Sequence, residues 1–127
     1  MGHIEFDHVQ LAAPAGCEAE ARRFFGDLLG LDEIEKPELL RPRGGVWFRC
    51  GSHQLHIGVE DAFSPALKAH PAFRVSGDDL QRLAERLRAA GASVEWDDTS
   101  PGMRRFYTAD PWGNRIEVLG AAGTRDP

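Results

Sequence analysis

A chain of 127 residues with 42% hydrophobic and 28% charged residues has the composition of one folded domain, and this excludes a disordered or membrane-embedded protein. Its net charge of −5 at pH 7 disfavours nucleic acid as a partner, and no apolar run is long enough to cross a bilayer. The N-terminus lacks the pattern of a secretion signal, so we expect a cytoplasmic protein with free thiols at Cys17 and Cys50.

The sequence repeats itself at an offset of about 61 residues. Three pairs of residues match at this offset: His8 with His70, Gly30 with Gly91, and His56 with Glu117. Such an internal match predicts two copies of one structural unit. We therefore expect a single domain over residues 1–127, with one repeat at about residues 4–60 and the other at about residues 68–119.

Each repeat predicts the order strand, helix, strand, strand, strand. After a strand that contains His8, the first repeat has a helix from Glu18 to Leu29 and strands at Leu31 to Ile34, Val46 to Cys50 and Gln54 to Val59. After a strand that contains His70, the second has a helix from Asp78 to Ala90 and strands at Ala92 to Trp96, Arg105 to Ala109 and Arg115 to Leu119. We expect loops at Lys36 to Gly45 and Thr99 to Gly102, a linker at Asp61 to Ala69 and a frayed tail at Ala121 to Pro127.

Alternation along these strands separates apolar from polar side chains, and the apolar sets must face the helices. The opposite face collects imidazole, carboxylate, guanidinium and aromatic groups: His8, Gln10, Trp47, Arg49, His56, His70, Arg74, Arg105, Tyr107 and Glu117. If each sheet curls, these groups meet in a cleft. Imidazoles with a carboxylate have the composition of a divalent metal site, so the sequence predicts an α+β protein with such a site.

In these residues the chain resembles the vicinal oxygen chelate superfamily, which includes glyoxalase I, fosfomycin-resistance enzymes, extradiol dioxygenases and bleomycin-resistance proteins. The resemblance covers roughly Phe6 to Leu119, and its most specific segments are FDHVQLA, FFGDLLGL, HPAFRV and FYTADPWGNRIEVLG. It implies two βαβββ repeats whose curled mixed sheets form an open barrel-like cleft, with the helices on the outer face. It also implies a homodimer, and it leaves open whether the site forms within one chain or across two.

The resemblance implies one divalent cation per site. Each repeat supplies a ligand from its first strand and can supply one from its last, which gives the metal ligands His8, His56, His70 and Glu117. Zinc, nickel, iron, manganese and cobalt are not distinguished. Glyoxalases commonly have glutamate where this chain has His56, and this departure counts against a glyoxalase in particular. The role of His56 stays open between a ligand, a base and a substrate contact.

Three functions are compatible with the resemblance. The first is a lyase or isomerase of glyoxalase type, in which the cation stabilises an enediolate-like oxyanion of a small anionic substrate and Glu117 and His56 are catalytic. The second is a ferrous extradiol-type dioxygenase, for which two histidines and one carboxylate leave positions for substrate and dioxygen. The third is a resistance protein that binds a drug or metabolite without turnover.

The remaining polar and aromatic groups of the expected cleft are candidates for substrate binding: Gln10, Trp47, Arg49, Arg74, Arg105 and Tyr107. A guanidinium can hold an oxyanion by a forked contact, and an aromatic ring can pack an apolar part of the substrate. Arg104 and Arg115 are interpreted as solvated strand residues. The expected partner is thus a small molecule, and neither nucleic acid nor a membrane is expected.

Overall fold

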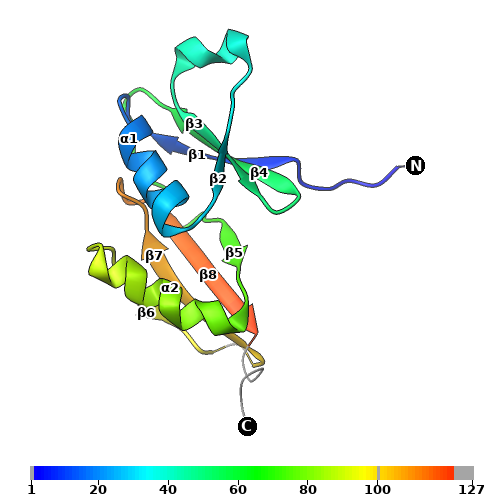
Figure 1. The fold of residues 1–127 in the computed structure, drawn as a ribbon, viewed down its shortest axis with the longest axis vertical. Helices are drawn as coiled ribbons and strands as arrows, with labels where there is room; N and C mark the ends of the chain where they lie inside the picture. The colour runs from blue at the N-terminus through cyan, green and yellow to red at the C-terminus, as the bar shows by residue number, and fades with distance from the viewer. Residues whose placement is uncertain (1, 100, 122–127) are drawn as a thin grey trace. The chain divides into compact units, whose positions relative to one another are not determined.

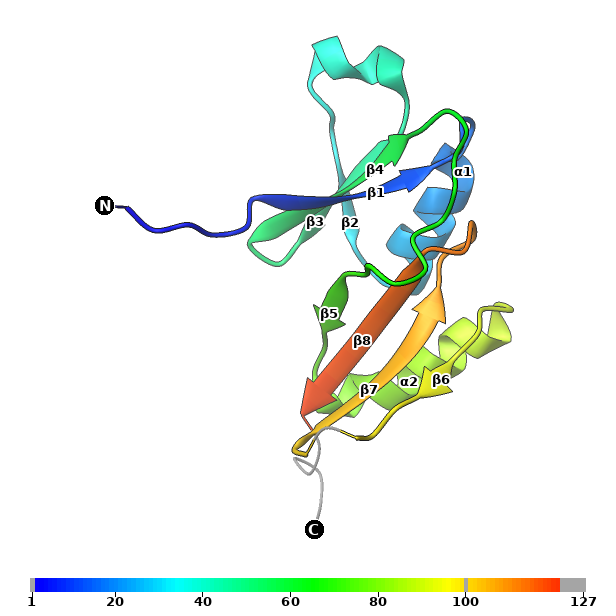
Figure 2. The same ribbon diagram turned by 180° about the vertical axis from the view of Figure 1, so that it is seen from behind.

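The protein is described by a computed structural model that covers residues 2–99 and 101–121. The chain divides into two compact units, residues 1–64 (unit 1) and residues 65–127 (unit 2). Each unit contains one four-stranded mixed sheet and helical segments, so the predicted α+β class is confirmed (Figures 1 and 2). No helix in the described ranges combines the length and the apolar character that crossing a bilayer requires.

Unit 1 has its first and last strands side by side. Its elements are β1 (His8–Ala13), α1 (Glu18–Ala21), η1 (Arg22–Leu28), β2 (Asp32–Ile34), η2 (Glu38–Arg43), β3 (Val46–Cys50) and β4 (His53–Val59). The strand order is β1-β4-β3-β2, with β1 parallel to β4 and the other pairs antiparallel. The register sets Gln10 opposite His56, so residues from both ends of the unit lie on adjacent strands.

Unit 2 repeats this topology. Its elements are β5 (Ala72–Arg74), α2 (Gly77–Ala89), β6 (Glu95–Trp96), β7 (Met103–Ala109) and β8 (Arg115–Ala121). The order β5-β8-β7-β6 matches that of unit 1 strand for strand, and β5 runs parallel to β8. The internal repeat read from the sequence is therefore a repeat of structure.

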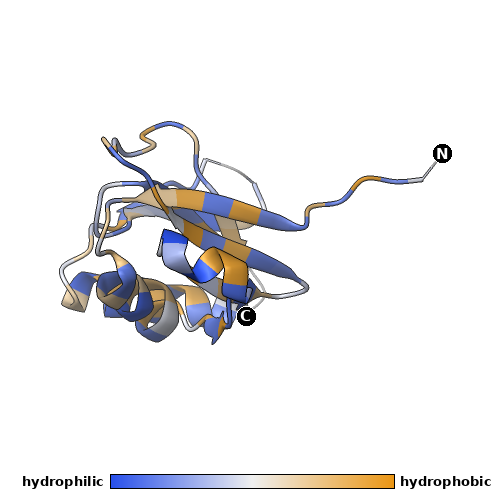
Figure 3. Cartoon of the chain, turned by 90° about the horizontal axis from the view of Figure 1, so that it is seen from above, coloured by the Kyte–Doolittle hydropathy of each residue, from blue (hydrophilic) through white to orange (hydrophobic). Residues whose placement is uncertain are grey.

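The hydrophobic core of each unit lies between its sheet and its helix. Figure 3 shows hydrophobic and hydrophilic residues alternating along the strands, as expected for sheets with one buried face. The largest strand residues of this core are at most 2% exposed: Phe48, Leu55 and Ile57 in unit 1, and Phe106, Ile116 and Val118 in unit 2. Burial of one such side chain contributes about 1.5–3 kcal/mol.

The helix predicted at Glu18 to Leu29 changes its winding. Only α1 is an α-helix, and η1 continues it as a π-helix in which the amide of Leu29 donates to the carbonyl of Phe24. Phe24 and Phe25, although consecutive, are both buried, at 4% and 0% exposure, and Phe25 packs against Phe48. The wider turn of a π-helix changes the angle between successive side chains, which suits the burial of two adjacent phenylalanines.

The second helix agrees with the sequence to within one residue. Ser76 caps its N-terminus, because its hydroxyl accepts a hydrogen bond from the amide of Asp78 at 3.3 Å. Acidic side chains occupy the first turn and basic ones the last, as the helix dipole favours. One face of α2 buries Leu80, Leu83 and Leu87.

Other boundaries differ from the sequence prediction. The expected loop at Lys36 to Gly45 contains the 3-10 helix η2, and the strands expected at His70 and at Ala92 begin only at Ala72 and Glu95. Of the expected tail, Ala121 belongs to β8 and residues 122–127 lie outside the described residues. The expected loop at Thr99 to Gly102 includes residue 100, which also lies outside them.

The junction between η2 and β3 is fixed by glycine and one carboxylate. Gly45 has φ +90°, and a Cβ atom there would collide with the carbonyl oxygen of Ile57, so only glycine fits. Its amide donates to Oε2 of Glu18 at 2.7 Å, and the neighbouring Gly44 carbonyl accepts from Nζ of Lys36. The hydrogen bond from Gly45 is the main reason why the pKa of Glu18 is lowered.

Candidate functional site

His70 and Glu117 form the central pair of unit 2. Nε2 of His70 lies 3.0 Å from Oε1 of Glu117, and the two side chains are 25% and 10% exposed. The Nδ1 atom of His70 lies 2.9 Å from the carbonyl oxygen of Lys68. A carbonyl can only accept, so Nδ1 carries a proton and the Nε2 atom of a neutral ring presents its lone pair to the carboxylate. Two electron-rich atoms at this distance are stable only with a proton or another cation between them.

The second oxygen of Glu117 is held by Arg105. Nη1 of Arg105 lies 3.5 Å from Oε2 of Glu117, while Nη2 lies 3.2 Å from Oδ2 of Asp97. Arg105 thus bridges two carboxylates. Burial opposes the charge on the guanidinium, but Tyr107, and after it Asp97 and Glu117, raise its pKa. The arginine that the sequence assigned to a substrate oxyanion is therefore engaged by protein groups in unit 2.

Unit 1 carries a stack of three rings. The ring of His56 lies between Trp47, with centroids 3.6 Å apart and planes at 4°, and His8, with centroids 4.1 Å apart and planes at 18°. His56 is 4% exposed and its Nε2 lies 2.8 Å from Oε1 of Gln54. Desolvation, and after it the nearby His8, lower the pKa of His56 to about 4.

His8 is held in the same way as His70. Its Nδ1 lies 2.9 Å from the carboxylate oxygen Oδ1 of Asp7, and its side chain is 43% exposed. The carboxylate is an acceptor, so Nδ1 of His8 is the donor and Nε2 remains free of that contact. His8 and His70 therefore each have Nδ1 anchored to an oxygen.

In the described part of the chain, the four candidate metal ligands form two contacting pairs, one in each unit. His8 stacks on His56 in unit 1, and His70 contacts Glu117 in unit 2. No group of three or more His, Cys, Asp and Glu side chains suitable for a metal ion is found among the residues described. The assignment of all four residues to one cation stays a prediction.

The turn between β7 and β8 has a buried polar centre that sets the start of β8. Asp110 and Asn114 are 4% and 2% exposed, and the Asp110 carboxylate accepts from the amides of Trp112 and Asn114 and from Nδ2 of Asn114. Burial raises the pKa of Asp110. This turn defines the register in which Tyr107 faces Glu117 and Ala109 faces Arg115.

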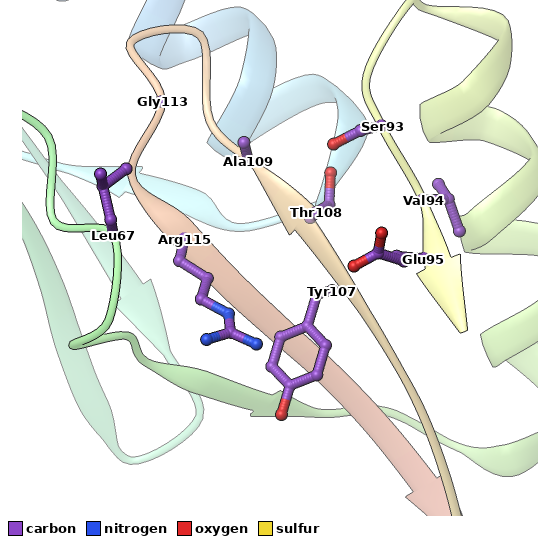
Figure 4. Close-up of a pocket in the computed structure, with 9 residues that line it drawn as sticks. All are labelled: Leu67, Ser93, Val94, Glu95, Tyr107, Thr108, Ala109, Gly113 and Arg115. Atoms are coloured by element: carbon purple, nitrogen blue, oxygen red, sulfur yellow. The ribbon is translucent and has the colours of Figure 1, made fainter. Parts of the chain in front are cut away.

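Unit 2 contains a pocket of about 280 Å³ beside Tyr107 (Figure 4). Its walls combine apolar, aromatic, hydroxyl and charged groups: Leu67, Ser93, Val94, Glu95, Tyr107, Thr108, Ala109, Gly113 and Arg115. The guanidinium of Arg115 lies 4.0 Å from the centre of the Tyr107 ring. Sequence reasoning assigned Tyr107 to substrate binding but treated Arg115 as a solvated residue. The signal that could have placed Arg115 is alternation along its strand, because Arg115 lies two residues before Glu117 and so shares its face.

Unit 1 has a smaller pocket of about 190 Å³. Two predicted substrate contacts, Gln10 and Trp47, line it together with Lys36 and Arg43, which the sequence placed in a loop. Gly58 leaves room for Gln10, because a Cβ atom at that glycine would lie 2.7 Å from the Gln10 amide nitrogen. Arg49 on β3 and Arg74 on β5 are exposed and line neither of these two pockets.

The sequence matches the family described as Glyoxalase-like domain over residues 10–119. A protein from Bacillus anthracis assigned to the glyoxalase family is 49% identical, with a TM-score of 0.88 over 95% of this chain and 98% of that chain. The Glutathione transferase FosA of Serratia marcescens is 28% identical over 100 residues, which are 75% of this chain and 67% of that protein.

More distant solved structures share the fold. The fosfomycin resistance protein FosX of Listeria monocytogenes is 16% identical, with a TM-score of 0.77 over 94% of this chain and 95% of that chain. A glyoxalase/dioxygenase from Nostoc punctiforme is 21% identical, with a TM-score of 0.76 over 92% of this chain and 90% of that chain. With the family match and the duplicated topology, these likenesses establish that the chain belongs to the glyoxalase-like domain family of the vicinal oxygen chelate superfamily.

Proposed function

We propose that the protein is a metal-dependent enzyme of glyoxalase type, and that both units together form one domain, which acts on a small anionic substrate. The observation that carries this proposal is the contact of Nε2 of His70 with Oε1 of Glu117 at 3.0 Å, with Nδ1 of His70 donating to a backbone carbonyl. Histidines that bind metals commonly donate their second nitrogen to such an acceptor. The pair thus fits a divalent cation, which takes nitrogen and carboxylate donors.

The ligands we propose are Nε2 of His8, Nε2 of His70 and a carboxylate oxygen of Glu117. His8 supports this set because its Nδ1 is anchored to Asp7, as Nδ1 of His70 is anchored to Lys68. His56 differs, since its Nε2 contacts Gln54 and its ring is stacked on both faces. We therefore give His56 the role of holding the ring of His8, in place of the ligand role that the sequence favoured.

When bound, a divalent cation would polarise two neighbouring oxygens of the substrate and stabilise the negative charge that develops there. The protein supplies the rest of the chemistry. Glu117 is the carboxylate available to accept a proton from a carbon next to the polarised group, and Arg105 fixes its orientation through Oε2. Arg115 and the hydroxyl of Tyr107 offer donors to an anionic group beside it.

Metal titration by calorimetry tests this proposal. We expect wild type to bind one equivalent of a divalent transition metal, and we expect His8→Ala, His70→Ala and Glu117→Gln each to bind about a hundredfold more weakly. His53→Ala is the matched control, because His53 is an exposed histidine on β4. Unchanged affinity in Glu117→Gln would refute the ligand set, and His56→Ala binding as weakly as His8→Ala would restore His56 as a ligand.

A second function has one observation in its favour. If His56 supports the stack, the remaining set of two histidines and one carboxylate is the arrangement that ferrous oxygenases use. Oxygen consumption by the iron-loaded protein with catechols would support a dioxygenase. Turnover of thiol adducts with zinc, nickel, cobalt or manganese would support the glyoxalase type.

We also propose a homodimer, and a mixing experiment tests whether the site combines residues from two chains. His8→Ala and Glu117→Gln each remove a ligand from a different unit. If sites form across two chains, mixing the variants after mild denaturation and refolding regenerates wild-type sites in part of the heterodimers. If sites form within one chain, the mixture binds metal no better than either variant alone.

A further inference from the structure

The pocket beside Tyr107 contains two opposite charges that do not pair with each other. Glu95 faces Tyr107 across the β6–β7 register, and Arg115 faces Ala109 across the β7–β8 register. Tyr107 and Ala109 are two residues apart on β7, so all four side chains project from the same face of the sheet. Figure 4 shows the Glu95 carboxylate and the Arg115 guanidinium extending toward β7 from its two sides.

Both charged groups are free to bind a ligand. Among the described residues, the Arg115 guanidinium contacts only the Tyr107 ring, at 4.0 Å, and the Glu95 carboxylate has neither a hydrogen bond nor an ion pair. Arg105, two residues before Tyr107 on β7, is already occupied by Asp97 and Glu117. Among the described residues, the pocket therefore has a cationic group on the β8 side of β7 and an anionic group on the β6 side, both available to a ligand.

The rim of the pocket combines one hydroxyl group with apolar side chains. Thr108 also borders the pocket, but its side chain alternates with those of Tyr107 and Ala109 and so projects from the opposite, buried face of β7. Ser93 lies at the edge beside it, while Leu67, 72% exposed, and Val94 provide apolar walls.

We propose that this pocket binds a small zwitterion of α-amino-acid type, with its carboxylate on Arg115 and its ammonium group on Glu95. The stacked guanidinium is preorganised for a forked contact with a carboxylate, and a glutamate is the complementary partner of an ammonium group. The volume of about 280 Å³ suits a molecule of that size. An anion alone would leave Glu95 without a partner and beside the bound negative charge.

The inference deepens the proposed function and rests on it in one respect. Tyr107 faces Glu117 across the register, so the pocket borders the proposed metal ligand, and the zwitterionic group belongs to the substrate or to a second substrate. The binding of the zwitterion itself needs no metal. The two proposals can therefore fail separately.

The test compares three small probes that differ in charge: L-alanine carries both charged groups, propionate carries only the carboxylate, and ethylamine carries only the ammonium group. Each is titrated into the full metal-free protein, and backbone amide shifts are followed by NMR. We expect L-alanine to shift the amides of Ser93, Glu95 and Thr108 at concentrations where propionate and ethylamine do not. Equal shifts with propionate, or no shifts at these amides with L-alanine, would overturn the proposal.

Variants connect the binding to the two charges. We expect Arg115→Gln and Glu95→Gln each to weaken L-alanine binding by about tenfold, the loss typical of one charge-assisted contact. Arg86→Gln and Glu85→Gln remove the same charges from the exposed side of α2 and should bind as wild type does. If the pocket variants also bind as wild type does, the assignment is wrong.

Metal titration of the same variants separates the two proposals. Arg115→Gln and Glu95→Gln should bind the cation as tightly as wild type, since neither is a proposed ligand. Metal binding without L-alanine binding would refute the zwitterion pocket and leave the proposed function standing. L-alanine binding by a protein that takes up no metal would refute the proposed function and leave the pocket standing.

Discussion

Arg105 holds one oxygen of Glu117, with Nη1 of the arginine 3.5 Å from Oε2 of the glutamate, and leaves the other oxygen to face His70. This relationship separates two roles for the arginine. A residue that binds substrate affects the Michaelis constant, whereas a residue that orients a metal ligand affects the affinity for the metal. Under the ligand set proposed above, the contact with Glu117 gives Arg105 the second role.

We expect Arg105→Gln to bind the divalent cation about tenfold more weakly than wild type, since residues that orient ligands contribute on this scale. Asp97→Asn should have a smaller effect of the same sign, because Asp97 contacts Arg105 and not Glu117. Calorimetric titration measures both. Arg104→Gln removes the neighbouring arginine on β7 as a control, and an unchanged metal affinity in Arg105→Gln would return this residue to substrate binding.

The stack of Trp47, His56 and His8 should contribute to the stability of unit 1. We expect Trp47→Ala to lower the free energy of unfolding by about 1–3 kcal/mol, because it removes the ring that lies 3.6 Å from His56. Trp47→Phe keeps an aromatic face and should lose less. Urea denaturation followed by circular dichroism measures both, and equal losses in the two variants would show that stacking is not the cause.

The backbone at Gly45 should tolerate no side chain. Gly45→Ala is expected to lower the free energy of unfolding by about 2–4 kcal/mol, from the left-handed backbone and from the collision with Ile57. Gly51→Ala is the matched control, since its φ is +61° but no atom lies within 4 Å of an added Cβ. We expect it to lose only about 1 kcal/mol. If both variants lost the same free energy of unfolding, the collision with Ile57 would not be the cause of the loss in Gly45→Ala.

Acid should remove the stabilising contribution of Glu18. The pKa of Glu18 is lowered in the folded protein, first of all by the Gly45 amide, so the folded state favours the carboxylate. Its contribution is fully present above the pKa of the unfolded chain, about 4.3, and is lost as the pH falls through the lower folded value. Wild type should exceed Glu18→Gln in stability at about pH 7, and the difference should shrink at about pH 3.

Denaturation curves at both pH values measure this difference. Glu20→Gln, an exposed change on α1, controls for the loss of one negative charge without the hydrogen bond to Gly45. A gap between wild type and Glu18→Gln that is the same at both pH values would contradict the prediction.

The topology was predictable because the sequence repeats it. Gly30 and Gly91, with φ of +81° and +93°, follow the helices in both units, and polar and apolar residues alternate along the strands. The π-helix was not predictable, because the sequence around Phe24 and Phe25 also fits an α-helix. The difference comes from packing partners such as Phe48, which contacts Phe25 and which the local sequence does not reveal. Strand ends were misplaced where hydrogen-bond partners, and not composition, decide the boundary.

The candidate site was predictable in its residue types but not in its contacts. His8, His70 and Glu117 were identified as candidates because residue types that bind metals stand at matching positions of the repeat. Alternation along the sequence also separated the polar from the apolar faces of the strands correctly. The sequence did not show that Arg105 is occupied by Asp97 or that Arg115 stacks on Tyr107. These contacts depend on side-chain conformation and strand register, which single-sequence patterns do not encode.

The parallel pairing of β5 with β8 makes His70 and Glu117 neighbours although 47 positions separate them. During translation His70 is synthesised before Glu117. A nascent chain therefore lacks this pair of donor groups until β8 has left the ribosomal exit tunnel. A chain terminated before β8 would contain His70 without Glu117. The contact between His70 and Glu117 can therefore form only after β8 has paired with β5.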